Sequence, residues 1–181
     1  MKSSFPLVYT FLAFFFLLLV LVRSDVIRDS CDKAAKGDPN INFEFCVASL
    51  EQNPKSKTAT CTEDLVPISI EIATSNATSI SSIVSKLLKK KSLEKFTRSC
   101  LEACSELYSE AGSDLQSGGQ AFESKDYGTA NVDISAALDA PETCEDGFKE
   151  KKGLVSPLTK ENHNFFQLTA IPLAFITMVQ K

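Results

Sequence analysis

The sequence has only one histidine, His163, among its 181 residues. A hydrolytic triad needs a histidine base within hydrogen-bond reach of its nucleophile, and no serine–histidine–acid grouping surrounds this residue. CxxC pairs, HxxxH pairs and calcium-binding loops with alternating Asp residues around a glycine are also absent. These absences argue against an enzyme, a metal site and a bound cofactor, and we interpret His163 as a surface residue.

Carboxylates gather around Cys144 in the stretch AALDAPETCEDGF, residues 136–148. Hydrolysis by a carboxylate pair needs two such groups on opposite sides of a cleft. A tightly packed domain of this size offers no obvious cleft. We therefore interpret Glu142, Glu145 and Asp146 as a solvated helix face.

Strand-like alternation of apolar and polar residues is missing as well, and apolar residues instead recur at a helical period of about 3.6. This spacing predicts a short helical hairpin over residues 31–53 and four long amphipathic helices, over 65–88, 93–115, 127–148 and 158–179. Asp126 is a candidate N-cap of the third long helix, and Ser156 with Pro157 is a candidate start for the fourth. Long helices with short connections predict an all-α fold, an antiparallel four-helix bundle.

The sequence lacks an excess of basic residues. It has 19 Lys and Arg against 23 Asp and Glu, a formal net charge of −4. Nucleic acids and anionic membranes select basic surfaces, so we expect neither as a partner. A basic protein partner is compatible with this balance.

Apolar runs lie at both ends of the chain. Residues 1–24 combine Lys2, an apolar run and the small residue Ser24, which is typical of a cleaved secretory signal. The C-terminal run lacks the polar spacer of a lipid-anchor signal, so we interpret it as a bundle helix. We expect one secreted domain of residues 25–181, with the helical hairpin over 25–55 and the bundle over 56–181.

All six cysteines follow the predicted signal. Disulfides are the default state of cysteines in an oxidising compartment, but spacing alone does not choose among the pairings. Cys100 and Cys104 lie four residues apart on one helical face, which suits two metal ligands or halves of disulfides, and secretion favours disulfides. The sequon that begins at Asn76 lies near the apolar face of the first long helix, which makes Asn76 a doubtful glycosylation site.

Several motifs in this chain resemble the plant invertase and pectin methylesterase inhibitor family. They are the early pair Cys31 and Cys46, the stretch NPKSKTA, CSELY at Cys104 and TCEDGF around Cys144. The run from Cys144 to His163 is similar to that of pollen invertase inhibitors, several of which are allergens. The resemblance covers nearly the whole predicted mature chain.

The resemblance implies a four-helix bundle with an N-terminal helical hairpin and two disulfides, Cys31–Cys46 and Cys104–Cys144. Cys61 and Cys100 lie outside the four-cysteine pattern of the family. Because they fall at opposite ends of adjacent antiparallel helices, we expect them to be unpaired or used between chains. We expect a monomer, with a dimer through a free thiol as the alternative.

The resemblance also implies an inhibitor that occupies the substrate cleft of a cell-wall carbohydrate enzyme in the apoplast. Invertase inhibitors of the family carry Pro-Lys-Phe at the turn between the second and third long helices, where this chain reads ESKDYGTAN. Lys125, Asp126 and Tyr127 look more like the turn of pectin methylesterase inhibitors, and Thr143 agrees with that choice. We therefore expect these four residues to contact pectin methylesterase. The alternatives are acid invertase as the target, a non-inhibitory secreted bundle, or a carrier of a small ligand.

Overall fold

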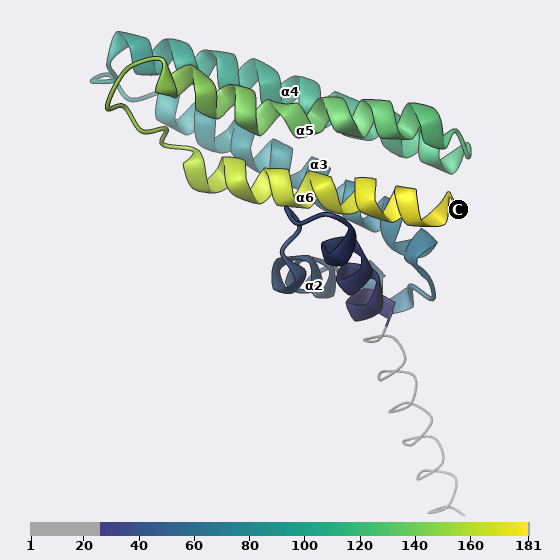
Figure 1. Cartoon of the computed structure of the whole chain (residues 1–181). Helices are drawn as coiled ribbons and strands as arrows, with labels where there is room; N and C mark the ends of the chain where they lie inside the picture. Colours follow the sequence, from purple (N-terminus) through teal and green to yellow (C-terminus); the bar gives the residue numbers. More distant parts are fainter. Residues whose placement is uncertain (1–25, 181) are drawn as a thin grey trace, which may run out of the picture.

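The computed structural model describes residues 26–180, so the predicted secretory signal lies outside the described residues (Figure 1). The long helices are α3 (Thr62–Leu88), α4 (Lys95–Glu123), α5 (Tyr127–Lys149) and α6 (Thr159–Val179). Each of them packs against two of the others, in the closed order α3, α4, α5, α6. Residues 26–180 contain no β-strand. The predicted all-α bundle is confirmed.

Buried apolar side chains at helical spacing hold the bundle together. Each long helix contributes one buried face, and the largest fully buried side chains are Tyr108, Phe148, Phe165, Phe175, Leu50, Leu65, Ile80, Leu101, Leu115, Ile134, Leu158 and Ile171. The C-terminal run is part of this core, because α6 buries Phe165, Ile171 and Phe175 almost completely. The interpretation of this run as a bundle helix therefore agrees with the structure.

The start of α6 lies one residue after the expected one, and its cap differs. Ser156 Oγ accepts a hydrogen bond from the backbone N–H of Leu158 at 3.1 Å, but the helix itself begins at Thr159. Ser156 and Pro157 thus form a turn that precedes the helix, and Leu158 is the N-cap residue without a capping side chain.

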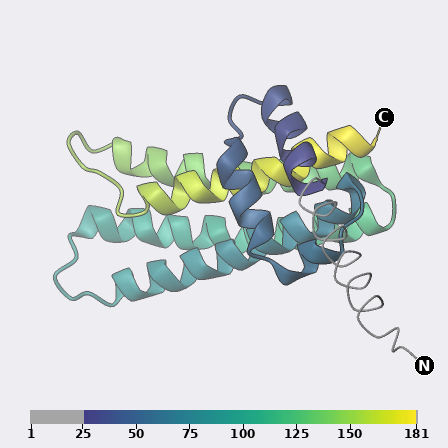
Figure 2. The same cartoon turned by 90° about the horizontal axis from the view of Figure 1, so that it is seen from below.

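A helical hairpin packs across one side of the bundle. It consists of helical residues 26–37, α2 (Phe43–Glu51) and the short 3₁₀ helix η1 (Pro54–Thr58). Gln167 on α6 ties the hairpin down, because its side-chain oxygen accepts from the backbone N–H of Asn42 at 2.9 Å. The hairpin lies against α3 and α6, and the outer faces of α4 and α5 stay uncovered (Figures 1 and 2).

Two disulfides cross-link the chain. Cys31 bonds Cys46 within the hairpin, and Cys104 on α4 bonds Cys144 on α5, the two pairings that the resemblance implies. Cys61 and Cys100 are free. Cys61 is exposed, whereas the buried Cys100 thiol donates to the carbonyl oxygen of Gly147 at 3.4 Å.

Helices α4 and α5 approach closely at Gly118. A Cβ atom there would lie 2.7 Å from Ile134 Cγ1 and 3.3 Å from the carbonyl oxygen of Ala130, whereas nothing lies within 4 Å of a Cβ at Gly112. We expect Gly118→Val to lower the free energy of unfolding by about 2 kcal/mol through overpacking. Gly112→Ala should raise it by about 0.5–1 kcal/mol, because alanine favours the helix. Urea denaturation of both variants measures these effects, and equal effects at the two positions would contradict the close approach.

Candidate functional site

The turn between α4 and α5 holds three of the four residues that the sequence singles out. Lys125 has a φ of 63°, and no other non-glycine residue in 26–180 has a positive φ. Asp126 caps α5, since its carboxylate accepts from the Thr129 backbone N–H at 3.1 Å and from the Thr129 hydroxyl at 2.8 Å. These hydrogen bonds, the backbone one first, lower the pKa of Asp126. The turn is therefore a fixed structure despite its exposure.

Lys125 extends from this turn toward the start of α3. Its ammonium group forms an ion pair with Glu63 and lies 5.8 Å from the centre of the Phe122 ring. The hydrogen bond from Lys125 to Glu63 raises the pKa of the lysine. Both side chains stay largely exposed, so the pair is available to a partner and contributes little to stability.

Tyr127 and Thr143 differ in their surroundings. The Tyr127 ring is half-buried and packs on Phe122 with 5.5 Å between ring centres, so it both supports the turn and remains partly open to solvent. Thr143 is exposed, but it lies sixteen residues further along α5, about 24 Å from Tyr127 at the helical rise. The structure therefore brings the three turn residues together and leaves Thr143 apart from them.

An exposed stripe on α5 links these two places. Val132, Ala136, Asp139 and Thr143 recur at spacings of three and four residues, which places them on one side of the helix, and all four are exposed. Val132 is 69% exposed and is one of two large apolar side chains that the described residues leave so open. The residue pattern alone does not single out Val132. Its position off the buried face of the helix is the sequence feature that could have indicated an exposed apolar side chain.

The α4–α5 hairpin carries a strong negative charge. Residues 99–148 contain eleven acidic residues and one basic residue, Lys125, a formal net charge of −10. Asp133 on α5 accepts a hydrogen bond from Ser117 on α4 at 2.6 Å. Partial burial, followed by the charges of Asp133 and Glu110, raises the pKa of the neighbouring Asp114. The uncovered side of the bundle is thus its acidic side.

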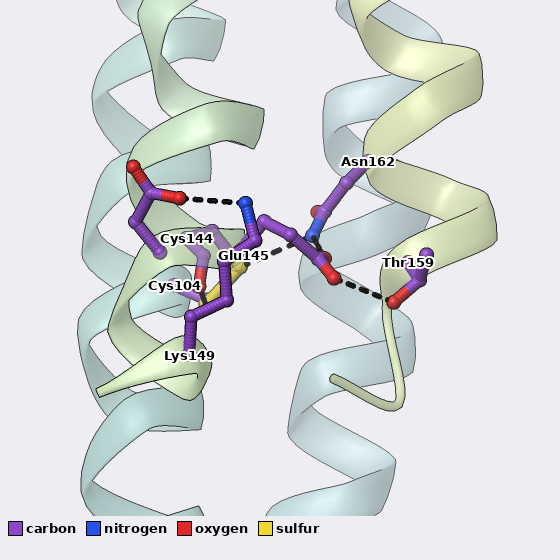
Figure 3. A network of polar contacts seen from close by, with 7 residues as sticks. Cys104, Cys144, Glu145, Lys149, Thr159 and Asn162 are labelled. Carbon is purple, nitrogen blue, oxygen red and sulfur yellow. Dashed lines mark hydrogen bonds and ion pairs between the residues drawn. A yellow bond between two sulfur atoms is a disulfide. The ribbon is translucent and has the colours of Figure 1, made fainter. Parts of the chain in front are cut away.

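A buried polar network joins α4, α5 and α6 beside the Cys104–Cys144 disulfide (Figure 3). The Tyr108 hydroxyl donates to Asn162 Oδ1 at 2.6 Å, and Asn162 Nδ2 donates to Glu145 Oε2 at 2.7 Å. Glu145 Oε1 also accepts from the Thr159 hydroxyl at 2.7 Å. Burial first, and then the charges of Glu145 and Glu161, raise the pKa of Tyr108, so the tyrosine remains a hydrogen-bond donor.

This network corrects part of the sequence interpretation. Glu142 and Asp146 are exposed, as a solvated face requires, but Glu145 is half-buried and holds α6 against α5. His163, the residue after the buried Asn162 on α6, is exposed. Asn76 lies in the middle of α3, and its amide oxygen is buried without a hydrogen-bond partner.

Other features of the described residues concern metal ligation, membrane spanning and surface grooves. Across residues 26–180, no three His, Cys, Asp or Glu side chains are grouped as metal ligands. No helix within that range is long and apolar enough to span a membrane. A groove of about 1020 Å³ lies between the helical hairpin and the bundle, lined by charged residues such as Lys33 and Glu63 and by apolar ones such as Leu173 and Met178.

Comparison with known proteins decides the family. Residues 25–175 match the family model described as "Plant invertase/pectin methylesterase inhibitor". The chain belongs to this family. Members of the plant invertase/pectin methylesterase inhibitor family inhibit cell-wall enzymes and are not enzymes themselves.

Some relatives within the family are named as invertase inhibitors and others as pectinesterase inhibitors. A Platanus acerifolia protein named "Putative invertase inhibitor" is 44% identical over 179 residues, which cover 99% of each chain. "Pectinesterase inhibitor 12" of Arabidopsis thaliana is 40% identical over 154 residues, which cover 85% of this chain and 87% of the relative. The crystal structure of a mutant pectin methylesterase inhibitor from Arabidopsis superimposes with a TM-score of 0.67, at 21% identity, over 82% of this chain and 93% of that one. At this sequence identity, the structural similarity shows a shared fold.

Proposed function

We propose that the chain is a secreted inhibitor of pectin methylesterase, which blocks the active-site cleft of the enzyme by one-to-one binding. The observation that carries this proposal is the α4–α5 turn, where Lys125, Asp126 and Tyr127 stand in place of Pro-Lys-Phe. This turn lies at one end of the bundle, away from the helical hairpin's place against α3 and α6 (Figure 1). In this proposal residues 1–24 are the secretory signal, and residues 25–181 form the single mature domain in the apoplast.

The conformation of the turn supports a binding role. A lysine in the left-handed region costs free energy that glycine or asparagine would avoid, and such backbone strain is concentrated at functional sites. The Asp126 cap and the packing of Tyr127 on Phe122 hold this conformation before any partner arrives. A preformed turn on a disulfide-linked bundle loses little conformational entropy on docking.

The surroundings of the turn indicate how the partner is held. Tyr127 is a residue type that anchors protein interfaces, and its ring is partly exposed. The exposed Lys125 and Val132 extend this surface on either side of it in the sequence. Thr143 then contacts the far side of the partner along the α5 stripe. The acidic α4–α5 hairpin favours a target whose cleft has a basic rim, because complementary charge speeds association.

A second candidate is inhibition of acid invertase. The name of the Platanus acerifolia relative favours it, and the relative covers almost the whole chain. The name of the Arabidopsis thaliana relative favours pectin methylesterase. The residues of the turn decide our choice between the two.

Parallel titrations test the choice. Residues 25–181, refolded under oxidising conditions, should abolish the activity of a plant pectin methylesterase at equimolar concentration and leave an acid invertase active. Tyr127→Ala should weaken inhibition about 30-fold, as expected for loss of an interface anchor worth about 2 kcal/mol. Val155→Ala is the control, since Val155 is an exposed apolar side chain in the α5–α6 loop at the far end of the bundle.

Three results would contradict the proposal. Inhibition of invertase alone would show that the Pro-Lys-Phe motif is dispensable and would favour the second candidate. Inhibition of neither enzyme by a correctly disulfide-bonded chain would favour a non-inhibitory bundle. Equal inhibition by Tyr127→Ala and Val155→Ala would place the contact surface away from the turn.

A further inference from the structure

Two loops that are distant in sequence meet at one end of the bundle. The α3–α4 loop and the α5–α6 loop lie at the same end of the bundle in both views, opposite the α4–α5 turn (Figures 1 and 2). Lys151 of the second loop contacts the junction of the first loop and α4, with its ammonium group 3.3 Å from Glu94 and 5.6 Å from the centre of the Phe96 ring. The two loops therefore form a single surface.

This surface is basic in a chain whose net charge is negative. Residues 86–98 contain six basic residues and one acidic residue, and residues 149–152 contain three basic residues and one acidic residue. The two segments together have a net charge of +7, whereas the whole chain has a net charge of −4. We call five of its exposed lysines the lysine end: Lys89, Lys90, Lys91, Lys95 and Lys152. None of these five takes part in an ion pair within residues 26–180.

Arg98 fixes the loop from which three of these lysines extend. Its guanidinium group donates to the carbonyl oxygen of Leu88 at 2.9 Å and to that of Lys90 at 3.1 Å. These hydrogen bonds restrain the backbone that carries Lys89, Lys90 and Lys91. The lysines thus extend from an ordered loop, while their ammonium groups stay free to meet negative charge.

We propose that the lysine end binds an anionic polysaccharide with a carboxylate on successive sugars, namely de-esterified galacturonan. Several lysines spread over two loops suit a polymer with repeated single charges, since an ammonium group is a compact point charge without the planar fork of arginine. A membrane surface fits less well. Interfacial binding needs several apolar side chains beside the charges, and Val155 is the one large, open apolar side chain that the described residues place here.

The choice of this polymer as the ligand rests on the proposed function, because demethylation by pectin methylesterase creates this polymer. Hydrolysis of each methyl ester leaves one carboxylate on the chain, so negative charge accumulates where the enzyme has acted. An inhibitor that binds this product concentrates at sites of past enzyme activity. The 29 residues of α4 separate the lysine end from the α4–α5 turn by about 43 Å, so both surfaces can be occupied at once.

Retention on immobilised polysaccharide tests the proposal. The purified protein should be retained by polygalacturonate at low ionic strength, released by about 0.5 M salt, and not retained by highly methyl-esterified pectin. The variant Lys89→Gln/Lys90→Gln/Lys91→Gln/Lys152→Gln should bind at least about tenfold more weakly. The control Lys33→Gln/Lys36→Gln/Lys55→Gln/Lys57→Gln makes the same change in net charge on the helical hairpin and η1, and should bind as the unmodified protein does.

The outcomes separate this proposal from the one on which it rests. Equal retention of both variants, or equal retention by the two polymers, would overturn it. So would sedimentation with anionic phospholipid vesicles in the absence of binding to polygalacturonate. Inhibition of pectin methylesterase, measured with the same variants, should be unchanged. A protein that is retained by polygalacturonate but inhibits no esterase would instead overturn the proposed function.

Discussion

Removal of the Cys104–Cys144 disulfide is expected to lower the free energy of unfolding by about 4 kcal/mol. The bond joins residues 40 positions apart, and a cross-link over such a loop restricts the unfolded chain by about that amount. For a domain of this size the midpoint of thermal unfolding should fall by roughly 8–16 °C. Chemical and thermal denaturation of Cys104→Ala/Cys144→Ala measure both quantities.

The free thiols determine the design of this experiment. Cys100 lies one helical turn from Cys104 on the same buried face, so it could replace Cys104 as the partner of Cys144 in a single variant. The reference is therefore a chain with Cys61→Ser and Cys100→Ala. Cys31→Ala/Cys46→Ala is the comparison, and its shorter separation of 15 predicts a smaller loss of about 3 kcal/mol. A larger loss for the hairpin bond would contradict the loop-length argument.

Asn162→Leu is expected to lower the free energy of unfolding by about 3 kcal/mol. The substitution removes the acceptor of the buried Tyr108 hydroxyl and a donor to the Glu145 carboxylate. Each buried group left without a partner costs about 1–3 kcal/mol. Urea denaturation monitored by circular dichroism measures the loss.

A double-mutant cycle shows whether the network itself is responsible. Tyr108→Phe should cost about 1–2 kcal/mol alone, and less when Asn162 is already leucine, because the hydroxyl then has no partner to lose. Asn164→Leu is the matched control on the same helix, and its half-exposed side chain predicts a change within about 0.5 kcal/mol. Strictly additive effects of Tyr108→Phe and Asn162→Leu would show that the two residues do not act together.

The sequence predicted the helices of the bundle well because each long helix has one continuous apolar face. The spacing of Ile80, Val84 and similar residues determines which side of α3 is buried, whatever the partner helix is. The two disulfide pairings came from the family resemblance, since spacing alone left the alternatives open. The end of α4 was the least accurate boundary, because the apolar spacing fades after Leu115 and Gly118 and Gly119 follow, yet the helix continues to Glu123.

The features that could not be predicted from the sequence depend on contacts between residues that are distant in the chain. The partners Tyr108 and Asn162 lie 54 positions apart, and nothing local distinguishes Glu145 from its exposed neighbours Glu142 and Asp146. The lysine end was missed for the same reason. Lys89 to Lys91 alone look like a solvated connection, and only the fold brings the α5–α6 loop, which carries Lys152, to the same end of the bundle. The left-handed backbone of Lys125 likewise has no signature in residue type.

The uneven placement of charge gives the molecule an electric dipole. Negative charge is concentrated along the α4–α5 hairpin, and positive charge is concentrated at the lysine end. A charged partner exerts a torque on such a molecule over roughly a Debye length, before any surfaces touch. Rotational search is thereby shortened, and a basic enzyme would meet the α4–α5 face more often than chance orientation allows. The net charge of the chain alone conceals this property.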